Sequence, residues 1–140
     1  MTKINERSFG VVPLQFRSDG IYLFLIQNHS EAWLLPKGHA EEKESPKETA
    51  ARELREETRL RVVEWLDPPS FVEHYSFMRE AQSIHKEVLY FPARVEGDVA
   101  LQRSELLDGR WIPADQFPEL ATFPEMKKVA SAVISWLQRI

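Results

Sequence analysis

The segment GHAEEKESPKETAARELREETRL, from Gly38 to Leu60, constrains the fold of this chain more than any other stretch. Ser45 can cap a helix, Pro46 suits the first helical position, and Glu48 stands where it completes a capping box with Ser45. These signals predict a helix that begins at Pro46 and ends at about Thr58.

Glu53, Glu56 and Glu57 stand at i, i+3 and i+4 of this helix, so their carboxylates share one face. A solvated surface helix would explain such a face, because Arg52 can pair with Glu56 one turn along. The preceding Lys-Gly-His loop at 37–39 favours a metal site, since it places a cation and an accessible backbone just ahead of the carboxylates. Mg²⁺ is typically held by carboxylate oxygens together with substrate phosphates.

The spacing of residues within the segment forms a longer pattern. Gly38 is followed after five residues by Glu44, and after seven more by Arg52-Glu53-Leu54, one residue and Glu56-Glu57. This pattern resembles the Nudix box, the signature of hydrolases that cleave nucleoside diphosphates linked to another group. The resemblance implies that Glu53, Glu56 and Glu57 bind Mg²⁺ or Mn²⁺. It also implies that Gly38, Glu44 and Arg52 support the loop and helix around them.

One position departs from the family pattern, which has glycine two residues after the paired glutamates, where this chain has Arg59. A helix end at that position often takes a positive φ angle, which glycine accepts freely and other residues adopt at roughly 1 kcal/mol or more. Arg59 therefore bears on how the helix ends and on stability, and it removes no metal ligand.

The rest of the chain alternates strand-like and helical patterns. Residues 7–16 and 21–28 are separated by an RSDG turn and predict a hairpin. Strands or extended segments are expected at 33–39, 71–77, 86–95 and 109–113, followed by an amphipathic helix from about 124 to 137. This order predicts an α/β (α+β) fold in one domain, residues 1–140, as an α/β/α sandwich with a mixed β-sheet between helices, which the Nudix resemblance also implies.

Several short motifs lie outside the box: Trp33, Leu35 to His39, Tyr75, Lys86 to Phe91, Glu105, Arg110-Trp111 and Phe123 to Met126. Together they resemble the asymmetric diadenosine tetraphosphate hydrolases, a subgroup of the Nudix family. The resemblance implies a metal-dependent, nucleotide-binding hydrolase in which water attacks a phosphorus of diadenosine tetraphosphate, giving ATP and AMP. Its expected cofactor is Mg²⁺, with Mn²⁺ as the alternative.

Four polar residues are candidates for work on the polyphosphate. Lys37 and Lys86 suit phosphate contacts, although a surface lysine with its head in water is the alternative for each. His39 could contact a phosphate, assist proton transfer or only hold the loop. Glu105 could be a further metal ligand or the general base, with Glu57 as the other candidate base and a solvated loop glutamate as the alternative.

Tyr75 and Phe123 resemble the aromatic residues of the subgroup's adenine clamp. Adenine can stack on the faces of such rings. Packing in the core is the alternative for both.

The formal net charge of -4 disfavours a general nucleic-acid-binding surface, so we expect no stable nucleic-acid partner. An RNA 5′-pyrophosphohydrolase, another nucleoside-diphosphate-X hydrolase and a non-catalytic nucleotide-binding regulatory module remain alternative functions. The amino terminus is polar, cysteine is absent, and no stretch approaches the roughly 18 apolar residues of a membrane helix. We therefore expect a cytoplasmic protein without a membrane partner, and a monomer.

Overall fold

The computed structural model describes residues 3–140 and confirms the predicted amino-terminal hairpin. Strand β1 (Lys3–Arg17) turns into β2 (Gly20–Asn28), and the two pair in antiparallel fashion with Leu14 opposite Leu23. β1 starts earlier than the apolar pattern predicts, because its polar first residues are held by pairing with a distant strand rather than by burial.

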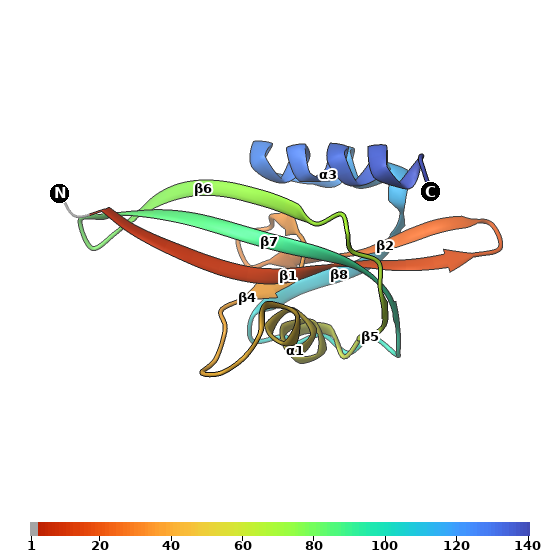
Figure 1. Cartoon of the computed structure of the whole chain (residues 1–140), viewed down its shortest axis with the longest axis horizontal. Helices are drawn as coiled ribbons and strands as arrows, with labels where there is room; N and C mark the ends of the chain where they lie inside the picture. Colours follow the sequence, from red (N-terminus) through yellow and green to blue (C-terminus); the bar gives the residue numbers. More distant parts are fainter. Residues whose placement is uncertain (1–2) are drawn as a thin grey trace.

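Six further strands complete one sheet: β3 (Trp33–Leu34), β4 (Lys37–Gly38), β5 (Arg61–Trp65), β6 (Phe71–Arg79), β7 (Gln82–Glu96) and β8 (Leu106–Pro113). The central order is β3-β2-β1-β7-β5, with β4 beside β1, β6 beside β7 and β8 beside β2. β1 and β7 pair in parallel over their length, whereas the other described pairs are antiparallel. The predicted mixed sheet is therefore confirmed (Figure 1).

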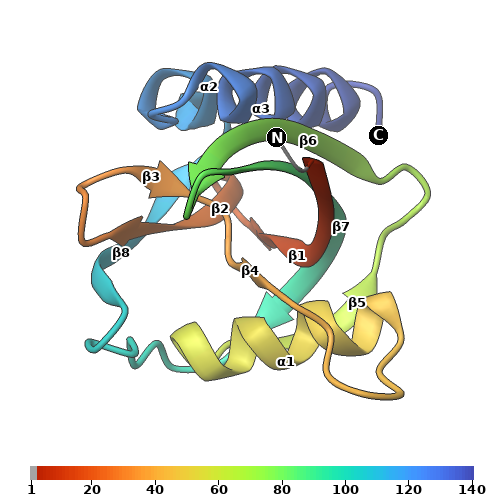
Figure 2. The same cartoon turned by 90° about the vertical axis from the view of Figure 1, so that its left-hand side faces the viewer.

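Helices cover both faces of this sheet (Figure 2). Helix α1 (Pro46–Thr58) lies on one face, with the bounds that the capping signals predict. Helices α2 (Phe117–Leu120) and α3 (Pro124–Leu137) lie on the other, preceded by the short 3-10 helix η1 (Ala114–Gln116). The arrangement is an α/β/α sandwich. Among residues 3–140, no helix is long and apolar enough to cross a membrane.

The sheet divides the buried side chains into two layers, because successive residues of a strand point to opposite faces. In β1, Val12 and Leu14 belong to the layer beneath α3, whereas Phe9 and Val11 belong to the layer against α1. Leu54 of α1 is fully buried in that second layer. Burying one such leucine contributes roughly 1.5–3 kcal/mol, which fixes the orientation of α1 and of its glutamates.

The sequence patterns give no indication of β5, η1 or α2. β5 is mostly exposed or half-buried and contains a register shift between Val62 and Glu64, so it lacks a regular alternation of apolar and polar residues. η1 and α2 together are shorter than the window in which helical periodicity can be recognised.

Helix α1 ends at Arg59, which has φ 68° and ψ 3° and donates its backbone N–H to the Arg55 carbonyl. This is the left-handed conformation that glycine adopts without strain. The positive φ expected at this position is present, and an exposed arginine occupies it where the family pattern has glycine.

We expect Arg59→Gly to stabilise the protein by roughly 0.5–1 kcal/mol, because it relieves left-handed strain but makes the unfolded chain more flexible. Arg55→Gly is the matched control: it makes the same replacement inside the helix and should destabilise by about 1 kcal/mol. Urea unfolding of both variants measures the difference. A magnesium titration of Arg59→Gly should give the parent affinity, and a large loss of metal binding would contradict the assignment of Arg59 to stability alone.

Candidate active site

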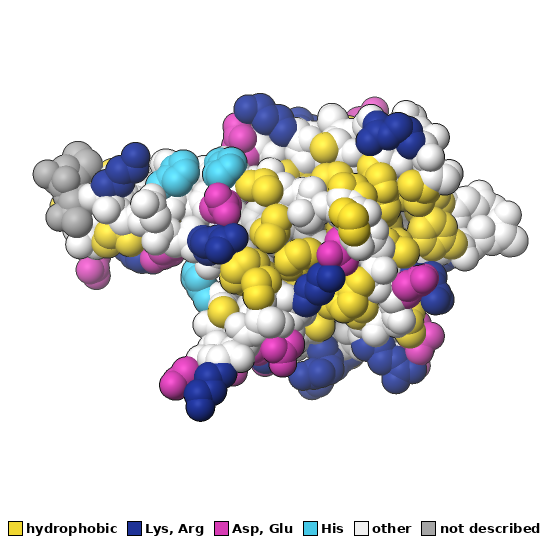
Figure 3. Space-filling view, viewed as in Figure 1, with side chains coloured by type: hydrophobic (Ala, Val, Ile, Leu, Met, Phe, Trp, Pro, Cys, Tyr) yellow, Lys and Arg dark blue, Asp and Glu magenta, His cyan; other side chains and the backbone are white. Residues whose placement is uncertain are grey.

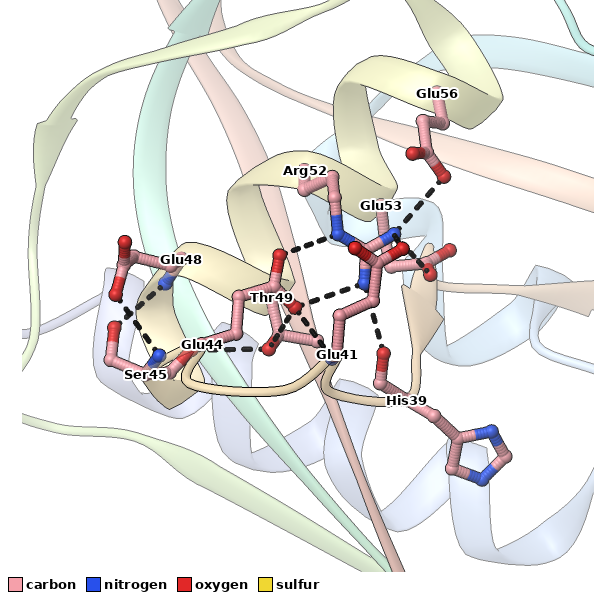
Figure 4. Close-up of polar contacts among 9 residues, drawn as sticks. All are labelled: His39, Glu41, Glu44, Ser45, Glu48, Thr49, Arg52, Glu53 and Glu56. Carbon is pink, nitrogen blue, oxygen red and sulfur yellow. Dashed lines mark hydrogen bonds and ion pairs between the residues drawn. The ribbon is translucent and has the colours of Figure 1, made fainter.

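The start of α1 is fixed by the capping box that the sequence predicts. The Ser45 hydroxyl accepts from the Glu48 backbone N–H at 3.2 Å, and the Glu48 carboxylate accepts from the Ser45 backbone N–H at 3.0 Å (Figure 4). With Pro46 in the first turn, these contacts satisfy backbone groups that a helix start otherwise leaves unpaired.

Arg52 ties the preceding loop to the helix (Figure 4). Its Nε donates to Glu44 Oε2 at 2.6 Å, and its Nη2 donates to Glu44 Oε1 at 3.0 Å and to the His39 carbonyl at 2.9 Å. Glu44 also accepts from the Glu41 backbone and the Thr49 hydroxyl. The Arg52 hydrogen bond, followed by that of the Glu41 backbone, lowers the pKa of Glu44 to about 2. These are the contacts that a supporting role for Glu44 and Arg52 requires.

The third nitrogen of Arg52 contacts the carboxylate face itself. Nη1 donates to Glu53 Oε1 at 3.0 Å and to Glu56 Oε2 at 3.1 Å. The solvated-helix interpretation of the sequence foresaw the pairing of Arg52 with Glu56, but the arginine side chain is only 14% exposed and holds more than that one partner. The ion pair is thus part of a network rather than an isolated surface contact.

Glu57 is the most buried member of the carboxylate face, at 6% exposure. Burial first, and then the Glu53 carboxylate, raise its pKa to about 8. Within residues 3–140, its Oε2 atom is buried without a hydrogen-bond partner. A buried carboxylate oxygen in this state is unfavourable unless a proton or a cation satisfies it.

Gly38 allows the loop to approach these carboxylates. A Cβ atom at this position would overlap the carboxyl group and Cγ of Glu53. Gly38 pairs with Phe9 where β4 lies against β1, so its backbone cannot move away without breaking that pairing. A side chain at position 38 would therefore displace the Glu53 carboxylate from its place against β4.

The donor set suits a hard divalent cation, since it consists of carboxylate oxygens, one of them orphaned. In the part of the chain that the structure describes, however, no three His, Asp or Glu side chains are already grouped in a metal-binding arrangement. Glu53 and Glu56 both accept from Nη1 of Arg52. The residues fit the cation in kind, and Glu53, Glu56 and Glu57 are the ones that could hold it.

A polar cavity of about 470 Å³ brings together most of the residues singled out in the sequence. It is lined by Lys37, Gly38, His39, Arg52, Glu53, Glu56, Glu57, Lys86 and Glu105, among others. Glu44 lies outside this lining, behind Arg52. Glu105 reaches the box because the loop before β8 is hydrogen-bonded to the end of α1: Gln102 N–H donates to the Glu57 carbonyl and Ala100 N–H to the Thr58 carbonyl.

The cationic side of this cavity is built by strands. Lys86 Nζ lies 3.1 Å from His39 Nε2, and Lys86 is only 9% exposed, so it is not a solvated surface lysine. Burial, and then the neighbouring Lys37, lower the pKa of Lys86; burial and Lys86 likewise lower that of His39. Glu6, which the sequence patterns do not indicate, places Oε1 3.7 Å from His39 Nε2 and accepts from Arg79 through Oε2.

A second, mainly apolar cavity of about 490 Å³ contains the two aromatic candidates. Tyr75 and Phe123 line it together with Leu34 and Met126, and Lys37 lines both cavities. Phe123 is 47% exposed, which argues against the core-packing alternative for this residue. Tyr75 is partly buried and packs against the core beneath α3, so it both lines the cavity and contributes to the core.

Comparisons with known proteins agree with this arrangement. A family model described as the NUDIX domain matches residues 5–136. A rat protein named asymmetrical bis(5'-nucleosyl)-tetraphosphatase is 34% identical over 127 residues, which cover 89% of this chain and 78% of that protein. A Mycobacterium tuberculosis protein that carries the name of a mutator protein is 27% identical over 111 residues, 77% of this chain but only 43% of its own length.

The fold is shared with solved structures. A C. elegans Ap4A (diadenosine tetraphosphate) hydrolase matches with a TM-score of 0.71 and 19% identity, covering 96% of this chain and 98% of that one. At this identity the match establishes the common architecture.

The burial of Glu57 predicts how metal-free protein responds to pH. Its pKa is about 8 when folded and about 4.5 when unfolded, so folding favours the protonated group. Its stabilising contribution is complete below about pH 4.5 and is lost as the pH rises through about 8, by on the order of a few kcal/mol. Unfolding in a chelator at pH 5 and pH 8 measures this loss. Glu57→Gln, which cannot ionise, should lack this component, and an equal pH dependence in both proteins would contradict it.

Proposed function

Because the chain belongs to the Nudix family of hydrolases, we propose that it hydrolyses dinucleoside polyphosphates, with diadenosine tetraphosphate cleaved to ATP and AMP by water attack on phosphorus. The observation that carries this proposal is the polar cavity, where the box carboxylates face Lys37, His39 and Lys86. Its apolar neighbour, reached past Lys37, gives a nucleobase a place beside the phosphates.

Lys37 and Lys86 bind the polyphosphate chain in this proposal. Burial, and then the neighbouring Lys37, lower the pKa of Lys86, and an anion that lies between the two lysines offsets their repulsion. The lowered pKa of His39 favours its neutral imidazole. This neutral ring accepts a hydrogen bond from Lys86 and orients the Lys86 ammonium group. We assign His39 this orienting role on the phosphate side.

Glu53, Glu56 and Glu57 hold a divalent cation, Mg²⁺ or Mn²⁺, in this proposal. A cation bound there would supply positive charge that neutralises phosphate oxygens and lowers the pKa of a bound water molecule. Gly38 lets the loop close over Glu53, and Arg52 with Glu44 keeps the helix and the loop in register.

The proton of the attacking water goes to a carboxylate of the polar cavity. Glu57 and Glu105 both line it, one from the helix and the other from the loop that is hydrogen-bonded to the helix end. Separate Glu57→Gln and Glu105→Gln variants distinguish them. Replacement of the residue that acts as base changes the acidic limb of the pH–rate profile.

Tyr75 and Phe123 hold one adenine in the apolar cavity. Both residues line it, Tyr75 from β6 and Phe123 from the N-cap position of α3. The single-domain organisation, cytoplasmic location and monomeric state expected from the sequence stay predictions.

We expect the parent protein to convert diadenosine tetraphosphate to ATP and AMP only with Mg²⁺ or Mn²⁺ present. Glu57→Gln should lower kcat by at least about 100-fold, because it removes a buried anionic ligand. Glu42→Gln is the matched control, since Glu42 lies on the same loop–helix segment, is exposed and lines neither cavity. Near-parent turnover by Glu57→Gln would refute the metal site and favour a non-catalytic module.

Triphosphorylated RNA tests the nearest rival activity. Basic side chains on the face shown in Figure 3 are scattered among acidic ones rather than forming a band that could follow an RNA strand. We therefore expect kcat/KM for diadenosine tetraphosphate to exceed that for triphosphorylated RNA by at least about tenfold. The reverse preference, measured at matched ionic strength, would favour an RNA 5′-pyrophosphohydrolase.

A further inference from the structure

Glu73 is a buried acid that lies outside the box and has no part in the hydrolytic step described above. It is 5% exposed and lines the apolar cavity. On β6 it shares a face with Phe71 and Tyr75, because residues two apart in a strand point the same way. Phe71 packs against Trp136 of α3, so this face of β6 is the one turned toward α3 and the cavity.

Tyr90 holds one oxygen of this carboxyl group. Its hydroxyl donates to Glu73 Oε1 at 2.9 Å across the β6–β7 pair. Tyr90 is fully buried, and its ring fits only because Gly10 faces it in β1: a Cβ there would overlap the ring and the Pro36 carbonyl. The Tyr90 ring is therefore fixed, and it fixes Glu73 in turn.

A structural role alone accounts poorly for this acid. Burying a carboxyl group is unfavourable unless its oxygens are hydrogen-bonded, and burial raises the pKa of Glu73 while the Tyr90 hydroxyl and Lys37 oppose that shift. Tyr90 satisfies Oε1, which leaves Oε2 as a second acceptor in a group that lines the cavity. A ligand that donates a hydrogen bond to Glu73 Oε2 would satisfy this second acceptor.

The position of Glu73 indicates which ligand group this is. Tyr75, the proposed stacking partner, follows it by two residues on the same face, about 7 Å along the strand. Because Glu73, Tyr75 and Phe123 line the same cavity, a base stacked on the two rings has the Glu73 carboxyl group as a neighbour. Adenine offers one edge donor for such an acceptor, its exocyclic amine.

We propose that Glu73 is a specificity-determining residue that accepts a hydrogen bond from the exocyclic amine of the bound adenine. This rests on the proposed function, because it assumes that a nucleobase occupies the apolar cavity. It extends that function by making base selection depend on an acid outside the box, with Tyr90 as its positioning residue.

The test compares diadenosine tetraphosphate with the analogue in which both adenines are replaced by unsubstituted purine. Loss of the amine should lower kcat/KM of the parent roughly 10- to 100-fold, as expected for a hydrogen bond to a charged acceptor. Glu73→Ala should hydrolyse both substrates at similar, reduced kcat/KM. Glu73→Gln keeps an acceptor and should retain part of the discrimination. Glu125→Ala is the matched control, since Glu125 lines the same cavity from α3 and pairs with Lys128; it should discriminate as the parent does.

Equal kcat/KM of the parent on the two substrates, or full discrimination by Glu73→Ala, would overturn the assignment of Glu73. The first outcome needs no variant to fold. If the parent hydrolyses neither substrate, the proposed reaction fails. Calorimetric binding of AMP and of purine riboside 5′-monophosphate then decides the inference: tighter binding of AMP that is lost in Glu73→Ala supports it, and equal binding refutes it.

Discussion

The candidate site depends on the guanidinium group of Arg52. One side chain, 14% exposed, contacts the Glu44 carboxylate, the His39 carbonyl, and the Glu53 and Glu56 carboxylates. Two like charges 4 Å apart repel by about 4 kcal/mol at an effective dielectric constant of 20, so this many glutamates need a cation among them. Because its planar fork donates in several fixed directions, arginine can bind loop and helix at once, which lysine cannot. Gly38 lies against the Glu53 side chain, and both residues line the polar cavity.

The parallel pairing of β1 with β7 brings the remaining half of the site to that helix. It places Tyr90 beside Gly10 on one edge of β1, and β4 pairs with the other edge at that same residue, so Lys37 and Tyr90 flank Gly10. Lys86, four residues before Tyr90, then reaches His39. The cations and the carboxylates thus come from separate layers of the sandwich, which are joined through β1. The long polar start of β1 contributes to the site, since Glu6 contacts His39 from there.

The parts of the site predicted from sequence are those governed by local rules. Capping, helical spacing and the position of Gly38 all act within one segment, so the bounds of α1 and the shared face of Glu53, Glu56 and Glu57 follow from the residue pattern. Glu6, Glu73 and Tyr90 escaped prediction because their neighbours are set by strand register across the sheet. Arg52 was expected to support the loop, yet its simultaneous hold on Glu53 and Glu56 required the three-dimensional packing of the loop against the helix. β5 escaped because an edge strand with a bulge carries no regular pattern.

Lys37 connects two cavities of opposite character. It lines both, and its backbone is fixed because β4 pairs with β1 opposite Gly10. On one side, carboxylates and cations suit a hydrated, highly charged group; on the other, aromatic rings surround one buried acid. A ligand that carries only phosphates would leave the apolar side to water, and a base alone would leave the cations unpaired. The nucleotide joined to a polyphosphate that we propose as substrate suits both sides, and Lys37, which lines both cavities, lies where they meet.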